Sequence, residues 1–180
     1  MKKTILTFGL ISGILASLMM LAMLPFFKYF EHGNMGMVVG YTDIVLVALL
    51  IFFGIRSYRD NQAGGVITFG RGFAIGLGIS LISCVLYVAA WEIVYFNFMH
   101  GSMDNYFARL VEKAQSSGGT AEAIQAKVAS IRHSQQLYEN PLVNSLYTFI
   151  EPFPVDLLIT VISAAVLRRK TRAGSVAATA

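Results

Sequence analysis

The chain has 180 residues, of which 56% are hydrophobic and only 13% are charged, and its formal net charge is +4. The apolar residues come in long runs, which excludes an ordinary soluble domain and indicates a polytopic membrane protein. A hydrocarbon core of roughly 30 Å needs about 20 apolar residues per helix. The sequence therefore predicts a single all-α membrane domain over residues 1–180, a bundle of four transmembrane helices at residues 4–27, 37–55, 72–98 and 142–167.

The first expected span follows a Met-Lys-Lys start, as the apolar core of a secretory signal peptide would. A signal peptide has an apolar core of about 7–15 residues and ends at a small-residue cleavage site. The run here is longer and meets Pro25 and further aromatic residues, so we expect the helix to be retained. Gly9, Gly13 and Ser17 recur at every fourth position, a spacing that lets a second helix approach closely.

The second span carries a similar stripe that includes Gly40 and Asp43, which places Asp43 on the packed side and away from lipid. The connection after it, RSYRDNQAGGVITFGRG, combines three arginines with four glycines. Gly64 and Gly65 predict a turn, and Thr68 is expected to cap the third helix. The glycine spacing matches neither GxGxxG nor a P-loop, so we expect a tight turn rather than a phosphate site.

The third span has small residues at every fourth position, and they end at Cys84, the sole cysteine. A lone cysteine excludes an intramolecular disulfide and indicates a small packing residue. Small-residue stripes fit contacts within a bundle and contacts between subunits equally well, so a homo-oligomer stays open. The predicted helix-packing residues are Gly9, Gly13, Ser17, Gly72, Gly76 and Ser80.

Residues 99–141 form the longest polar stretch and predict two amphipathic helices joined by SSGGT. We expect Ser102 to cap the first helix and Thr120 to cap the second. The apolar stripes predict an antiparallel hairpin that either pairs with itself or docks an envelope protein or lipid headgroups through residues 102–138. These stripes consist of Tyr106, Phe107, Leu110 and Ala114, and of Ile124, Val128, Ile131 and Tyr138.

Basic residues cluster at the N-terminus, in the second connection and after the fourth span. Four spans place these three segments on one side, which the positive-inside rule identifies as the cytoplasm. The sequence thus predicts a multi-pass inner-membrane protein with both termini cytoplasmic, a basic tail at 168–180 and a periplasmic hairpin. Because the basic residues border spans, a nucleic-acid partner is not expected. The topology determinants are Lys2, Lys3, Arg56, Arg59, Arg71, Arg168, Arg169 and Lys170.

Metal, cofactor and enzyme signatures are missing from the sequence. His32, His100 and His133 fall on the expected outer side, but no two share a ligand spacing such as HxxxH. The chain has no GxSxG, HExxH or paired-cysteine motif either. We therefore expect no metal, no cofactor and no enzymatic activity.

Four acids fall at similar depth in the outer halves of the spans: Asp43, Glu92, Glu151 and Asp156. Unpaired carboxylates there cost roughly 2.5–3.5 kcal/mol each at the helix centre, so they must face the interior, water or a ligand. Pro152 and Pro154 predict a helix break that frees backbone carbonyls and opens a polar crevice. The four acids are thus a candidate proton or cation site.

The acids in the stretch FIEPFPVDLLIT have a simpler interpretation as well. If a helix starts near Pro154, proline takes its first position and Asp156 its third, and both are favoured there. Shallow acids also reach the water of the interface through flexible side chains. The sequence leaves both interpretations open.

Three stretches carry a resemblance: FFGIRSYRDNQAGGVITFGRGFAIG, SCVLYVAAWEIVYFNFM and EPFPVDLLITVISAAVLRRK. With the span order around them, they resemble a bacterial membrane-protein family known as domain of unknown function four-one-nine-nine, from Lys3 to Lys170. The resemblance implies four helices in the inner membrane of Gram-negative bacteria. It implies no activity, substrate or catalytic residue.

Two functions follow as expectations. The first is a non-enzymatic accessory or interaction module of the envelope, embedded in the lipid bilayer. The alternative is a small proton- or cation-binding transporter or channel subunit that uses the intramembrane carboxylates. A bundle of four spans offers a small cavity, so transport would require an oligomer.

Overall fold

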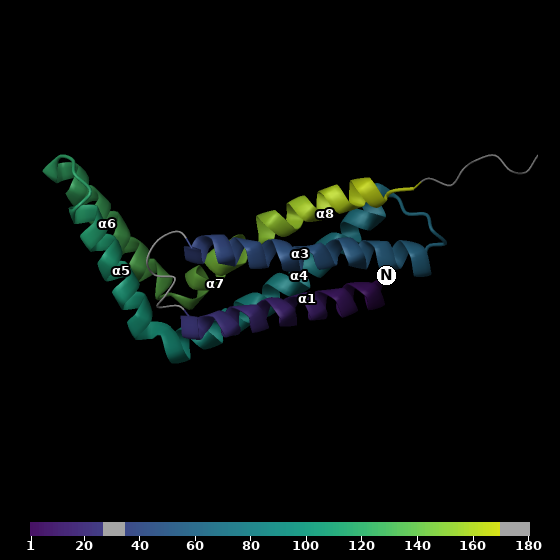
Figure 1. Cartoon of the computed structure of the whole chain (residues 1–180), viewed down its shortest axis with the longest axis horizontal. Helices are drawn as coiled ribbons and strands as arrows, with labels where there is room; N and C mark the ends of the chain where they lie inside the picture. Colours follow the sequence, from purple (N-terminus) through teal and green to yellow (C-terminus); the bar gives the residue numbers. More distant parts are fainter. Residues whose placement is uncertain (27–34, 170–180) are drawn as a thin grey trace, which may run out of the picture.

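Four long helical segments lie side by side in the computed structural model, which describes residues 1–26 and 35–169 (Figure 1). Each segment is long and apolar enough to cross a membrane, so the expected all-α architecture of a multi-pass membrane protein is confirmed. His32 and Lys170 lie outside the described residues. The spans are Lys2–Phe26, Val38–Asn61, Phe69–Met99 and Pro141–Leu167.

The first three spans are built on α1 (Lys2–Met23), α3 (Met35–Asn61) and α4 (Phe69–Val94). A short 3₁₀ turn, η1 (Leu24–Phe26), ends the first span. The outward faces carry large apolar side chains such as Leu10, which suits contact with lipid acyl chains.

The fourth span is broken, as its prolines predict. Asn140 caps α7 (Pro141–Ile150) by accepting a 3.0 Å hydrogen bond from the Leu142 amide, and α8 (Phe153–Leu167) follows after a turn. The Pro152 carbonyl accepts from the Asp156 amide at 3.0 Å and thereby starts α8. The helix thus starts near Pro154 with Asp156 in its first turn, as expected, but Pro154 is the second helical residue rather than the first because Pro152 is the N-cap.

Helix α4 is central and packs against α1, α3 and α8. Glycines allow this close approach: a Cβ added at Gly13 would lie 2.8 Å from the Leu86 Cβ, and one at Gly76 would lie 2.6 Å from the Thr160 Cγ2. The Ser17 hydroxyl also donates to the Leu86 carbonyl at 3.4 Å. The structure thus places the small-residue stripes of α1 and α4 at the α1–α4 and α4–α8 interfaces. Gly40 of the expected stripe on α3 is instead exposed, and a Cβ added to it would meet no heavy atom within 4 Å, so close packing at this position is not confirmed.

One end of the bundle, here called the loop end, gathers the N-terminus, the α3–α4 loop and the end of α8 (Figure 1). The Met1 amine donates to the Gln62 Oε1 at 3.1 Å, and the Arg169 amide donates to the Ile67 carbonyl at 3.0 Å. Gly64 and Gly65 turn the loop with positive φ angles of 61° and 81°, as predicted. Thr68 caps α4 by accepting from the Arg71 amide, which is also confirmed.

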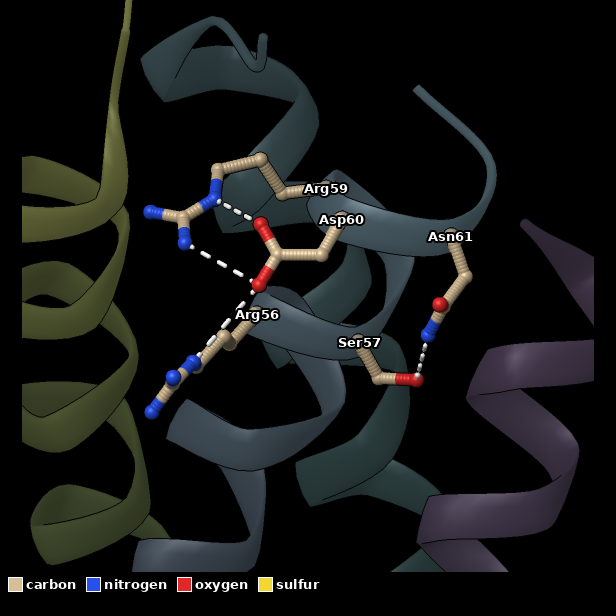
Figure 2. Close-up of polar contacts among 5 residues, drawn as sticks. All are labelled: Arg56, Ser57, Arg59, Asp60 and Asn61. Atoms are coloured by element: carbon tan, nitrogen blue, oxygen red, sulfur yellow. Dashed lines mark hydrogen bonds and ion pairs between the residues drawn. The ribbon is translucent and has the colours of Figure 1, made fainter. Parts of the chain in front are cut away.

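An ion-pair cluster closes α3 at the same end (Figure 2). Arg59 donates from Nε to the Asp60 Oδ1 at 2.6 Å and from a terminal nitrogen to Oδ2 at 3.1 Å. Arg56 approaches the same carboxylate at 3.6 Å. Next to this cluster, the bundle interior is filled by buried apolar side chains: Ile51, Ile55, Ile67, Ile75, Ile79 and Leu167.

At the opposite end, here called the hairpin end, α4 runs through a π-helical turn, η2 (Tyr95–Met99), into α5 (His100–Gln115). Helix α6 (Ala121–Tyr138) then returns beside α5, and the pair projects away from the bundle (Figure 1). Thr120 caps α6 by accepting from the Ala123 amide, as predicted. The prediction that Ser102 caps α5 is wrong, because the helix begins at His100 and Ser102 lies within it.

Glycine substitutions on α4 test the close helix approach. Gly76→Ala would push against Thr160, whose β-branched side chain is fully buried, so we expect a loss of about 1–3 kcal/mol in unfolding free energy. Gly70→Ala on the same helix has no heavy atom within 4 Å of its new Cβ and should change stability by at most about 1 kcal/mol. Denaturant unfolding in detergent micelles measures both. Equal effects would contradict the packing described here.

Candidate functional site

A cavity of about 190 Å³ lies in the half of the bundle nearer the hairpin end, between α1, α3, α4 and the start of α8. Two carboxylates, Asp43 and Asp156, line it, and we call it the aspartate cavity. Its other walls are mainly apolar, with several methionines from α1, and Tyr87 and Trp91 from α4. Among the described residues, no lysine, arginine or histidine lines it. The two acids therefore have no basic counterpart in the cavity wall.

Asp156 is only 5% exposed and sits in the first turn of α8, directly after the helix break. The Cys84 thiol donates to its Oδ2 at 3.7 Å, a weak hydrogen bond from a weak donor. One turn further, the hydroxyls of Ser80 and Thr160 lie 3.4 Å apart in the same α4–α8 interface. The lone cysteine is thus a buried packing residue that also contacts the carboxyl group.

The four acids do not form one cluster. Asp43 and Asp156 share the aspartate cavity, whereas Glu151 lines a neighbouring cavity. Glu92 accepts a 3.0 Å hydrogen bond from the Ser145 hydroxyl, between α4 and α7. The predicted site is thereby divided. Asp43 and Asp156 line one cavity, Glu151 lines the other, and Glu92 lies at the contact between α4 and α7.

The neighbouring cavity has a volume of about 430 Å³ and lies where the hairpin joins the bundle. We call it the aromatic cavity, because its wall holds one carboxylate, Glu151, and five rings, those of Tyr87, Trp91, Tyr106, Phe107 and Tyr138. Tyr87 and Trp91 line both cavities and so lie between them. Burial raises the pKa of Tyr138 to about 12, so this ring is a neutral phenol near pH 7.

Asn144 in α7 is a polar residue that the sequence analysis did not single out. Its side chain is fully buried, and its Oδ1 accepts from the Trp91 Nε1 at 2.9 Å and from the Thr148 hydroxyl at 3.3 Å. Its Nδ2 donates to the Tyr138 carbonyl at 3.1 Å. Asn144 therefore joins α4, α6 and α7 behind the aromatic cavity. An asparagine within an apolar span was the available signal.

The described part of the chain contains no group of three His, Cys, Asp or Glu side chains that could hold a metal ion. His133 is exposed on α6. The two aspartates of the aspartate cavity can take up a proton, accept hydrogen bonds or bind a small cation.

A family model described as "Protein of unknown function (DUF4199)" matches residues 7–169 of the chain. The chain belongs to this family. The resemblance expected from the stretches around the α3–α4 loop, Trp91 and Glu151 is thereby confirmed. No curated protein and no solved structure matches the chain. Membership of the DUF4199 family assigns no activity.

Asn144→Ala tests the polar junction behind the aromatic cavity. The substitution leaves the Trp91 Nε1 and the Thr148 hydroxyl without their buried acceptor, and each orphaned group should cost about 1–3 kcal/mol. Trp91 is the only tryptophan, so its fluorescence reports directly on this site during unfolding. Asn105→Ala, on the exposed face of α5, is the matched control and should leave the unfolding midpoint unchanged. An equally stable Asn144→Ala variant would contradict this assignment.

Proposed function

We propose that this DUF4199 protein resides in the bacterial inner membrane with its loop end in the cytoplasm and its hairpin in the periplasm. The support is charge placement: the N-terminus, the α3–α4 loop and the end of α8 lie together at the loop end and carry a concentration of basic residues. Under the positive-inside rule such an end stays cytoplasmic. In this orientation the aspartate cavity belongs to the periplasmic half of the bundle.

We further propose that the protein is not an enzyme but a membrane-embedded binding protein for a proton or a small cation, with the aspartate cavity as its site. One observation carries this proposal: Asp156 is 5% exposed, lines a cavity with Asp43, and has a thiol as its close polar neighbour. A buried carboxylate is costly unless it is neutralised or paired. A bound proton or cation supplies that compensation.

The geometry favours binding from the periplasmic side. The buried isoleucine-rich core lies between the cavity and the loop end, which supports access from the hairpin side. Transport would require a second arrangement of the helices or an oligomer that completes a pathway. Binding alone, as in a sensor or an accessory subunit of a larger assembly, requires neither.

Thermal unfolding of the detergent-purified protein tests the proposal. The parent is measured over a pH series and over a panel of monovalent and divalent cations, with Asp156→Asn beside it. A ligand at roughly 100 times its dissociation constant stabilises the folded state by about 2.7 kcal/mol, so we expect a clear shift for one cation or for protons. The shift should disappear in Asp156→Asn.

Two controls separate the site from general charge effects. Glu112→Gln removes an exposed acid of α5, and Glu92→Gln removes the acid held by Ser145. Both should keep the response of the parent. A parent that responds to no ligand in the panel, or an Asp156→Asn variant that responds as the parent does, would overturn the proposal.

An interaction role for the hairpin is the second candidate. The specific observation is that no residue of α6 is fully buried, although Ile124, Val128 and Ile131 form an apolar stripe on it. The base of the hairpin is occupied, because Leu110 and Ile131 pack against the buried rings of Tyr95 and Phe107. The part of the stripe farther from the bundle, at Ile124 and Val128, is half-buried. We propose that this part contacts an envelope protein or a second copy of the chain.

Site-specific photocrosslinking in intact membranes tests this contact. A crosslinker at the exposed position Gln125 should give one discrete product, and Val128→Glu should abolish it because the charge interrupts the stripe. Ala126→Glu, on the opposite face of α6, is the control and should retain the product. A product of twice the mass of the chain identifies a second copy. Absence of a discrete product, or its persistence in Val128→Glu, would contradict the contact.

A further inference from the structure

The aromatic cavity is not used by the proposed function, which rests on Asp43 and Asp156. It lies at the junction of α4, α5 and α7, at the level where aromatic side chains gather near the hairpin end. Its volume of about 430 Å³ falls within the range of roughly 300–1,000 Å³ that is typical of small-molecule sites. The cavity is therefore large enough for an organic group rather than a bare ion.

Three of the five rings of the wall contact one another in sequence. The centroids of Tyr106 and Phe107 are 5.7 Å apart, and those of Phe107 and Tyr138 are 6.3 Å apart. Phe107 is 8% exposed, whereas Tyr106 is 41% exposed, so the wall runs from the interior of the protein to its surface. Aromatic faces carry negative potential and attract cations, most strongly at tryptophan, which is present here as Trp91.

The charge of the wall points to a cationic occupant. Glu151 is the sole carboxylate of the cavity wall as far as the chain is described, and no basic residue shares that wall. Glu151 is exposed and follows the last residue of α7, at the helix break. A cation in the cavity would thus meet one anionic group and several aromatic faces.

The donor set favours an organic cation over a metal ion. Hard divalent ions take six or more oxygen ligands, of which this cavity offers one carboxylate. The Thr148 hydroxyl, also in the wall, already donates to Asn144 at 3.3 Å. Aromatic walls with a single acid are instead the arrangement that recognises alkylated ammonium groups, whose carbon atoms pack on the rings.

We propose that the aromatic cavity binds an alkylammonium group, with Glu151 as its counter-charge and Trp91, Tyr106 and Tyr138 as its aromatic cage. Two sources present this chemistry: the headgroup of an aminophospholipid, which lies at the level of the interfacial aromatic residues, and a free amine from the aqueous side. The site is independent of Asp156.

The intrinsic fluorescence of Trp91 offers a direct test, because this sole tryptophan is part of the cage. Tetramethylammonium chloride is titrated into the detergent-purified protein, with sodium chloride at equal ionic strength as the reference. We expect a saturable change with tetramethylammonium and none with sodium. Binding should weaken by at least about tenfold in Glu151→Gln and in Tyr106→Leu.

Three control variants test whether tetramethylammonium binding depends specifically on the residues of the cage. Glu92→Gln changes an acid outside the cage, and Tyr41→Leu changes an exposed tyrosine of α3 outside it, so both should bind tetramethylammonium as the parent does. Asp156→Asn should also bind normally, which separates this cavity from the aspartate cavity. A parent without a saturable change, or a Glu151→Gln variant with unchanged affinity, would overturn the proposal.

The source of the ammonium group is resolved in nanodiscs. Discs of phosphatidylethanolamine should stabilise the parent relative to discs of phosphatidylglycerol and weaken tetramethylammonium binding by competition, if the lipid headgroup is the occupant. If the occupant is a free amine, tetramethylammonium binds equally in both discs. Glu151→Gln should abolish the stabilisation by phosphatidylethanolamine in the first case and should weaken tetramethylammonium binding in the second. A variant that behaves as the parent does would contradict the site.

Discussion

The break between α7 and α8 determines where the fourth span packs and where both cavities lie. Proline has no amide hydrogen, so Pro152 and Pro154 cannot continue the hydrogen-bond ladder of the fourth span. The chain stops one helix at Ile150 and starts the next at Phe153. On the loop-end side of the break, α8 packs closely on α3 and α4. On the hairpin-end side, α7 packs on α4 and α6. Both cavities border the break, since Pro152 lines one and Glu151 the other.

The half of the bundle near the loop end is closely packed, and this distinguishes it from the half near the hairpin end. Small residues on α1, α4 and α8 bring the backbones together, and isoleucines fill the space between them. Van der Waals contact of this kind replaces the hydrophobic drive that is missing in lipid. The half near the hairpin instead holds carboxylates, aromatic rings and a buried asparagine around its cavities. This division separates a closely packed half from the half that holds both cavities.

Sequence patterns predicted the parts of the fold that depend on local chemistry. The spans follow from apolar runs, and the caps at Thr68 and Thr120 follow from their hydroxyls. The cap predicted at Ser102 failed because Tyr95 and Met99 are buried at the hairpin base and hold the chain in a helix through that point. Tertiary packing overrode a favourable cap residue there.

The candidate site was predictable only in part, because it is assembled across the sequence. The similar depth of the four acids is visible in the spans, but rotation about each helix axis decides which cavity a side chain faces. Glu92 is turned to Ser145, and Asn144 meets Trp91 across 53 positions of sequence. Such pairings depend on how the helices pack, which no single stretch encodes.

Infrared difference spectroscopy of the carboxyl groups, during titration with the stabilising cation or with acid, would show whether Asp156 is the binding group. We expect a carboxyl signal that changes on titration, is missing in Asp156→Asn and is retained in Glu92→Gln. A spectrum in which Asp156→Asn removes no signal would contradict the claim that Asp156 is the binding group of the aspartate cavity.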